Sequence, residues 1–216
     1  MALSKVNFNS LNLTPTASKT VVFNSSNNGI EAGDVGGALT LISTQTASSS
    51  STIDFTSGID STYKEYIFKF IDIHPATDNT DFTFQADTGT NTNYNQTLTT
   101  TFFDSTHRED GSDTGFGYAA GRDLAQSTSF QQLTGYQLSN DNDASACGTL
   151  HLFDPSNTTF VKHFISVTNM MGFDSQSTWQ GFCAGYFNTT TALTRVRFKM
   201  ASGNIDAGTI KMYGVT

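Results

Sequence analysis

From about residue 39 onward, the sequence consists of short stretches in which apolar and polar residues alternate. The clearest are 66–73 (Tyr-Ile-Phe-Lys-Phe-Ile-Asp-Ile) and 82–86 (Phe-Thr-Phe-Gln-Ala). This period of two is typical of a strand with one buried face, and strands separated by Gly, Asn, Asp and Ser turns predict an all-β sandwich or barrel. Further strands are expected at 39–42, 52–55, 97–103, 148–153, 160–168, 181–187, 193–200 and 209–215.

A helical repeat is missing from the same pattern. No apolar period of 3.6 residues runs for three turns, and the best candidate, 121–133, contains Ser127-Thr128-Ser129, which favours a loop. Strands with one apolar face must pack against a second sheet. We expect Phe68, Phe70 and Phe84 to lie in the core between the sheets.

The first 38 residues differ from the rest of the chain. Their short apolar pieces include Val6, Phe8, Leu11 and Leu13, and 33–37 (Gly-Asp-Val-Gly-Gly) is typical of a flexible joint. This segment has too little apolar content for a core of its own. The sequence predicts an N-terminal anchoring arm at 1–38 and a β-domain at 39–216, although the first segment also fits a pair of extra strands on that domain.

Composition supports the β prediction and points to an oligomer. Charged residues make up 14% of the 216 residues, against a usual value of about 25%. With so few charges, outward strand faces are suited to contact with neighbouring subunits. The net charge of −8 supplies no basic surface for nucleic acid. The alternating Arg195, Arg197 and Lys199 are expected on one strand face that meets solvent or a subunit.

Cys147 and Cys183 both lie in apolar, strand-like stretches. We expect them to act as free, small hydrophobic residues, with a disulfide between them as the alternative. The N-terminus lacks the apolar run of a signal peptide, and no stretch approaches 18 consecutive apolar residues. These features predict a protein that is made and folded in a cytosol without membrane insertion.

One sequence motif suggests an enzyme. Asp87-Thr88-Gly89-Thr90 spells the aspartic-protease signature, and Asp113-Thr114-Gly115 repeats its core. The chemistry needs two carboxylates that meet across a two-fold axis, and these copies are too close in sequence to belong to two lobes. Asp-Thr-Gly also suits a tight turn. No Gly-x-Ser-x-Gly or phosphate-binding loop occurs, so we expect no enzyme activity and no cofactor.

The histidines and acidic residues give no metal-binding signature. His151 and His163 are expected on adjacent strands, and the four histidines, which also include His74 and His107, lack metal-ligand spacing. Asn140-Asp141-Asn142-Asp143 is the densest acidic cluster, which we interpret as a solvated loop, with a Ca²⁺ loop as the alternative. No bound metal is expected.

Ligand contacts are expected on the irregular segment 104–143 and in one polar loop. Irregular loops on rigid sheets often carry binding residues. Trp179, in the polar stretch 175–180, and Tyr118 are candidate aromatic platforms for a glycan or receptor, and Asp141 and Asp143 are candidate hydrogen-bonding partners.

Several long stretches are similar to a known family. The similarity is sharpest at 47–55, 58–63, 73–78, 150–155, 184–191 and 198–214 and covers nearly the whole chain. On these stretches the chain resembles small virion structural proteins of tailed phages that infect marine bacteria, especially cyanobacteria. The resemblance implies a virion location, described for the family as fibre-like or decoration proteins, and brings no catalytic residues.

The leading interpretation is therefore a homotrimeric β-sandwich of jelly-roll type with a short N-terminal arm. The arm would attach it to capsid or tail proteins of the virion, as a capsid decoration or a short tail-fibre component assembled in the host cytoplasm. A host-surface glycan is a further expected partner. The alternative is a free, lectin-like carbohydrate-binding module.

Overall fold

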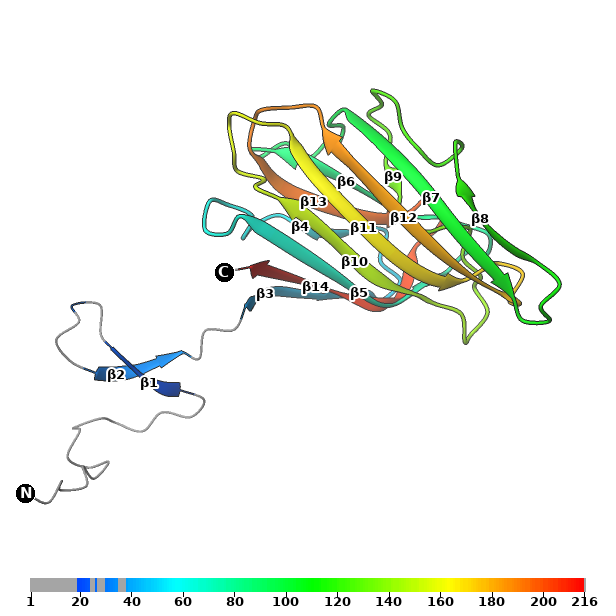
Figure 1. Ribbon diagram of the computed structural model, residues 1–216, viewed down its shortest axis with the longest axis horizontal. Coiled ribbons are helices and arrows are strands. Elements are labelled where there is room, and N and C mark those ends of the chain that lie inside the picture. The colour runs from blue at the N-terminus through cyan, green and yellow to red at the C-terminus, as the bar shows by residue number, and fades with distance from the viewer. Residues whose placement is uncertain (1–18, 24–25, 27–29, 35–37, 216) are drawn as a thin grey trace, which may run out of the picture. The chain divides into compact units, whose positions relative to one another are not determined.

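The computed structural model describes residues 19–23, 26, 30–34 and 38–215 (Figure 1). The chain divides into two units, residues 1–38 and 39–216, each described by itself. In the first unit, β1 (Lys19–Phe23) and β2 (Ile30–Asp34) pair as an antiparallel hairpin. The predicted arm residues Val6, Phe8, Leu11 and Leu13 lie outside the described residues.

The second unit is built on a large sheet whose neighbouring strands all run antiparallel (Figure 1). The strands predicted at 39–42, 66–73, 97–103, 148–153, 160–168, 181–187 and 209–215 all belong to this sheet, although their bounds differ by a few residues. In spatial order the strands are β3 (Leu39–Thr46), β14 (Ile205–Val215), β5 (Glu65–Pro75), β10 (Ala146–Phe153), β11 (Lys162–Met171), β12 (Ser177–Phe187), β7 (Leu98–Arg108) and β8 (Thr114–Tyr118).

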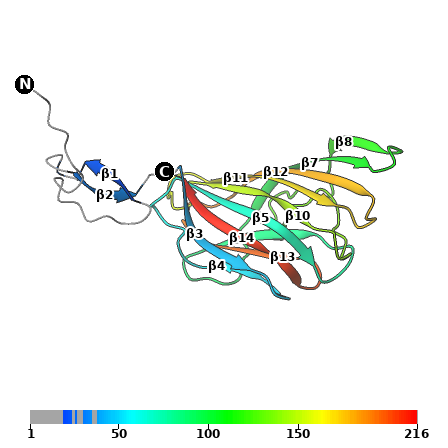
Figure 2. The same cartoon turned by 90° about the horizontal axis from the view of Figure 1, so that it is seen from below.

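A smaller antiparallel sheet packs against part of the large one (Figure 2). The predicted all-β, antiparallel β-sandwich is confirmed. The described residues form no helix, and therefore none that is long and apolar enough to cross a membrane. The strands of the small sheet, in spatial order, are β4 (Ile53–Phe55), β13 (Leu193–Met200), β6 (Phe82–Thr88) and β9 (Gln131–Gln132).

The strand order is that of a jelly roll with two added hairpins. The series β3-β14-β5-β10 and β4-β13-β6-β9 are the two four-stranded layers of such a fold. The remaining four strands extend only the large sheet: β7 and β8 come from the connection between β6 and β9, and β11 and β12 from the connection between β10 and β13. The large sheet therefore continues beyond its partner.

Phenylalanine rings fill the space between the sheets. The predicted core residues Phe68, Phe70 and Phe84 are confirmed, with exposed fractions of 0%, 3% and 0%. Phe198 of β13 lies at the centre, with ring centroids 5.4 Å from Phe68 and 5.2 Å from Phe70. Most of these rings meet edge to face, an arrangement that adds to the stability gained by burying apolar area.

The inner face of the extension is covered by residues 119–139. Main-chain bonds tie this segment to β7, with Thr100 N donating to the Leu124 carbonyl (2.8 Å), and the Thr168 hydroxyl of β11 donates to the Leu133 carbonyl (2.7 Å). The prediction of one irregular loop segment at 104–143 was wrong. Part of it forms strands β7 and β8, and Leu133 and Leu138 are fully buried.

A loop of the chain itself covers part of the outer face of the small sheet. Asp87 is fully buried, and its carboxylate accepts hydrogen bonds from the backbone N–H of Thr88 (2.8 Å) and of Tyr94 (2.8 Å) and from the Gln96 amide (3.1 Å). Gly89, with φ of +56°, turns the chain after β6. This Asp-Thr-Gly sequence thus holds a loop in place, whereas Asp113 is exposed in the turn between β7 and β8.

Loops and a strand of the same chain contact the basic side chains of β13. Arg197 donates two hydrogen bonds to Asp54, and its guanidinium lies 4.0 Å from the centroid of the Tyr94 ring. Lys199 lies 4.6 Å from the Phe130 ring centroid, and Arg195 donates to the Gly89 carbonyl. The three side chains share a face, as predicted, and loops of the same chain partly cover that face, so that each side chain is partly exposed.

The two cysteines are free and lie on opposite faces of the large sheet. Cys147 of β10 is exposed, whereas Cys183 of β12 is buried in the core, and β11 separates the two strands. Burial raises the pKa of the Cys183 thiol far above its ordinary value. A disulfide between them is incompatible with this arrangement.

Candidate interaction surface on the large sheet

Most of the exposed large apolar side chains of the described residues gather on the outer face of the large sheet. Their position follows from strand alternation, because Phe102, Phe164 and Phe70 face the core and the residues after them face outward. Phe116 is 74% exposed and Ile165 is 48% exposed. The set comprises Leu39, Leu41, Ile71, Phe103, Phe116, Tyr118 and Ile165. We call this surface the outer face.

Strand register aligns these residues in rows that cross the sheet. One row runs from β7 to β3 and places Ile165 directly between Ala184 and His151. Directly opposite side chains in a sheet lie within contact distance of each other. The row is thus a nearly continuous strip with few charges, formed by Thr101, Ala184, Ile165, His151, Ile67, Tyr213 and Leu41.

Aromatic side chains cluster where the β7–β8 hairpin closes the sheet. The ring of Phe103 lies 6.2 Å from Phe116, nearly parallel, and 5.2 Å from Tyr118 in an edge-to-face contact. Phe182 pairs with Phe103 from the neighbouring strand β12. The Tyr118 hydroxyl donates to the Asp123 carboxylate, which fixes this predicted contact residue on the outer face.

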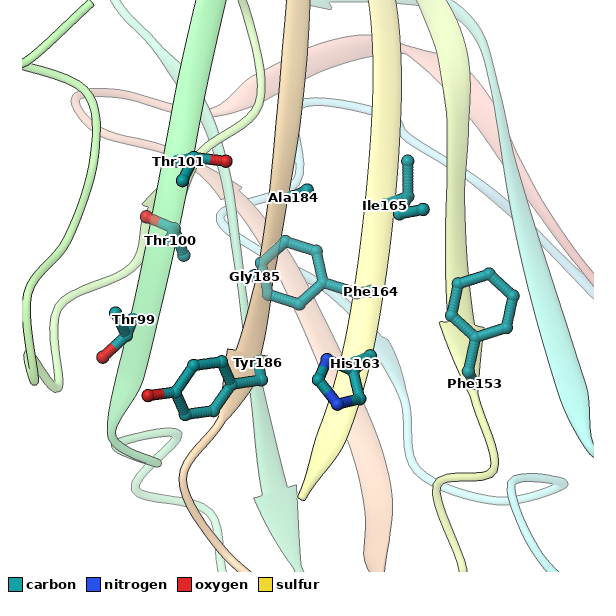
Figure 3. A pocket seen from close by; sticks show the side chains of 10 residues that line it. All are labelled: Thr99, Thr100, Thr101, Phe153, His163, Phe164, Ile165, Ala184, Gly185 and Tyr186. Atoms are coloured by element: carbon teal, nitrogen blue, oxygen red, sulfur yellow. The ribbon is translucent and has the colours of Figure 1, made fainter. Parts of the chain in front are cut away.

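A shallow depression of about 480 Å³ lies across β7, β12, β11 and the end of β10 (Figure 3). The methyl side chain of Ala184 and the backbone of Gly185 form its floor, while Tyr186, His163 and Phe153 stand in a row along one side of it. Glycine is required at 185, because a Cβ there would lie 2.6 Å from the Thr99 carbonyl oxygen. Gly185 pairs with the core-facing Phe164, so its close contact lies on the inner side of the sheet, and the hollow on the outer face follows from the small side chain of Ala184 among larger ones.

A second depression of about 510 Å³ adjoins the first and shares Phe153 and His163 with it. Its rim carries Phe160, which is 68% exposed. Lys162 holds this rim in place, because its buried ammonium donates hydrogen bonds to the carbonyls of Phe160 (2.7 Å) and Thr189 (3.2 Å). Burial lowers the pKa of Lys162. The two depressions are neighbours with Phe153 and His163 between them, and we refer to the pair as the groove.

The first depression has neutral walls and several free polar groups. None of its lining residues is Asp, Glu, Lys or Arg. Over the described part of the chain, the Tyr186 hydroxyl, the Thr101 hydroxyl and the His163 ring have no hydrogen-bonding partner, whereas His151 on the adjacent strand is bonded to Glu65 (2.5 Å). His151 and His163 thus lie on adjacent strands, as predicted.

The predicted contact residues are distributed over different parts of the fold. Trp179 is not in a loop: it lies in β12, faces inward and is half-buried against Tyr136, with ring centroids 4.5 Å apart. Its ring nitrogen donates to the Ser177 hydroxyl (3.2 Å). The expectation of an exposed Trp179 was therefore wrong, and Tyr118 lies on the opposite face of the sheet.

Asp141 and Asp143 lie in the exposed turn before β10. The Asp141 carboxylate accepts a hydrogen bond from Ser175, and its backbone carbonyl accepts one from the Ala144 N–H (2.9 Å). Within the ranges that the structure describes, no three His, Cys, Asp or Glu side chains form a group suited to a metal ion. The turn is thus held by hydrogen bonds of its own chain.

No protein-family model, curated protein or solved structure matches this chain.

Proposed function

We propose that this chain is a non-enzymatic structural protein on the surface of a tailed-phage virion. It acts as a homotrimer that its N-terminal arm attaches to the particle, as a capsid decoration or a short tail-fibre component. The resemblance to small virion proteins supports the location. The jelly-roll-like sandwich supports the structural role, because viral capsid proteins are one of the classes that use this architecture.

The observation that carries this proposal is the contrast between the two outer faces. Loops of the chain itself partly cover the basic side chains of the small sheet, whereas the outer face of the large sheet exposes apolar residues from β3 to β8. A large exposed apolar surface marks a site of interaction with another protein. In a trimer, the β3–β14–β5 side of this face in each copy would pack on a different surface of the next copy, so that the ring closes and the depressions on β7, β10, β11 and β12 stay uncovered.

The surroundings of Asp87 in the Asp-Thr-Gly motif support the proposal that the protein is not an enzyme. Asp87 is fully buried and binds three donors of its own chain, so its carboxylate is committed to holding residues 88–96. Asp113 belongs to an exposed turn at the end of the large sheet. A shared-proton pair of carboxylates needs close contact, which this placement does not provide.

Light scattering tests the assembly. We expect a mass of about three chains for the wild type, and a monomer for Leu41→Asp, which places a charge on β3, in the part of the outer face that the trimer would bury. The control is Ser202→Asp, an exposed loop position that should leave the trimer intact. A stable wild-type monomer at micromolar concentration would contradict the trimer.

Cryo-electron microscopy of the intact virion tests the location. Density for this domain over the capsid lattice would identify a decoration protein, and density on the tail would identify a fibre component. Absence of the chain from purified particles would overturn the virion proposal, whatever the oligomeric state.

A further inference from the structure

We propose that the groove on the outer face, formed by the two depressions that share Phe153 and His163, binds a neutral oligosaccharide. Tyr186 and Phe153 serve as platforms for the sugar rings, and His163 provides a hydrogen bond between them. This is a binding activity beyond the proposed structural role, and it does not depend on that role.

The shape of the groove fits a sugar better than a compact apolar ligand. Pockets for small molecules bury most of the ligand surface, whereas this groove is a shallow hollow on an open sheet (Figure 3). Its floor at Ala184 and Gly185 is flat, since neither residue has a side chain larger than a methyl group. A pyranose ring laid on that floor would lie beside the row formed by Tyr186, His163 and Phe153.

The chemistry of the walls matches the two kinds of surface on a sugar. The C–H face of a pyranose is apolar and packs on the electron-rich face of an aromatic ring such as Tyr186 or Phe153. Its edge carries hydroxyls that both donate and accept. The His163 ring and the hydroxyls of Tyr186 and Thr101, which have no partner within the described ranges, do the same.

Other classes of ligand fit the groove less well. The first depression has no Lys or Arg to bind a phosphate or a carboxylate. An extended peptide gains its affinity from unpaired strand edges, but β11 and β12 both have hydrogen-bonded neighbours on either side. A neutral ligand recognised through faces and hydroxyls remains the best match.

The length of the groove indicates more than one sugar unit. The second depression begins at the same Phe153 and His163 and continues past Asn157 and Thr159 to Phe160; it also includes Asp154, whose carboxylate pairs with Lys64. Each depression, at about 480 and about 510 Å³, has room for a separate sugar residue. We therefore expect an oligosaccharide to bind more tightly than a monosaccharide of the same kind.

The test uses the full chain in its native oligomeric state and an array of neutral gluco-, manno- and galacto-oligosaccharides, with sialylated and sulfated glycans included. The best neutral probe is then titrated by calorimetry. Tyr186→Ala is expected to weaken its binding at least about tenfold, and Tyr186→Phe should weaken it less, because the stacking face is kept. The matched control is Phe116→Ala, an exposed aromatic position at the other end of the outer face, which should bind like the wild type.

Near-ultraviolet circular dichroism checks that each variant is folded. The proposal is overturned if no neutral oligosaccharide binds, if only charged glycans bind, or if Tyr186→Ala and His163→Ala both retain wild-type affinity. A negative result here leaves the trimer mass and the position in the virion unchanged, so it is distinguishable from failure of the structural role.

Discussion

Arg197 and Asp54 lie directly opposite each other on β13 and β4, joined by two hydrogen bonds of 2.7 and 2.6 Å. The hydrogen bonds from Arg197 to Asp54 raise the pKa of Arg197 above its ordinary value. The strand β4 has only three residues and lies at the edge of the small sheet. A bidentate contact of this kind therefore helps to hold a strand that has little other pairing.

We expect Asp54→Asn to lower the free energy of unfolding by about 1–2 kcal/mol, because charge-assisted bonds to a partly buried partner are lost. Urea denaturation followed by fluorescence measures the change. The control is Lys64→Gln, which removes an ion pair to Asp154 in which the lysine side chain is 79% exposed. Its effect should stay below about 0.5 kcal/mol, and equal losses in both variants would contradict this account.

The central position of Phe198 makes it the most sensitive core residue. Phe198→Ala should cost about 3–5 kcal/mol, since it opens a cavity between the sheets. Phe116→Ala, at a site that is 74% exposed, should change stability by less than about 0.5 kcal/mol. The midpoints of thermal or urea unfolding compare the two. A small loss for Phe198→Ala would mean that the sheets close over the missing ring.

Asp81 gives a pH-dependent prediction. Burial raises its pKa, opposed by the positive charge of Arg122, and its Oδ1 atom is buried without a partner among the described residues. Between the ordinary pKa and the raised one, the folded protein binds more protons than the unfolded chain, so stability falls as pH rises through this window. At pH values above this window the carboxyl is charged in both states, and the free energy of unfolding is lowered by the full cost of burying that charge.

Asp81→Asn removes that cost. We expect the variant to be more stable than the wild type by about 1 kcal/mol at pH 7, and the difference to shrink toward pH 3, where the carboxyl is protonated in both states. Urea denaturation at the two pH values measures it. A variant that is less stable at pH 7 would mean that the attraction of Arg122 outweighs the cost of burial.

The two cysteines should react differently with a thiol reagent. Cys147 is exposed, whereas Cys183 is buried with a raised pKa. The folded protein is expected to show one reactive thiol per chain and the urea-unfolded protein two, because the thiolate is the reactive form. Cys147→Ser should abolish the reaction of the folded protein. Two reactive thiols in the folded state would show that Cys183 is accessible to the reagent, which would contradict its burial.

The alternation of apolar and polar residues predicted most of the strands, because a strand with one buried face requires that pattern. It failed at β8, where Gly115 and Gly117 interrupt the apolar pattern although Phe116 and Tyr118 share a face. Strand order was beyond prediction, since the pairing of β3 with β14 joins residues from opposite ends of the domain. Sequence periodicity contains no information on which strands become neighbours.

The groove was missed for the same reason. Phe153 and Tyr186 come together only because β11 pairs with both β10 and β12. A signal was present, because two consecutive large apolar residues in a strand put one on each face. Phe102-Phe103, Phe164-Ile165 and Tyr186-Phe187 are such pairs, and each places a large side chain on the outer face. Trp179 was misjudged because its polar neighbours suggested a loop.

The position of β14 also determines when the domain can fold. It is the last strand to be synthesised, yet it lies between β3 and β5, and β3 has no other neighbour in the large sheet. β3 therefore cannot pair until β14 has been synthesised, so the sandwich closes only after nearly the whole domain has been translated. Folds dominated by such distant pairings form slowly, and until then the unpaired edges of β3 and β5 are exposed to aggregation during synthesis in the cell.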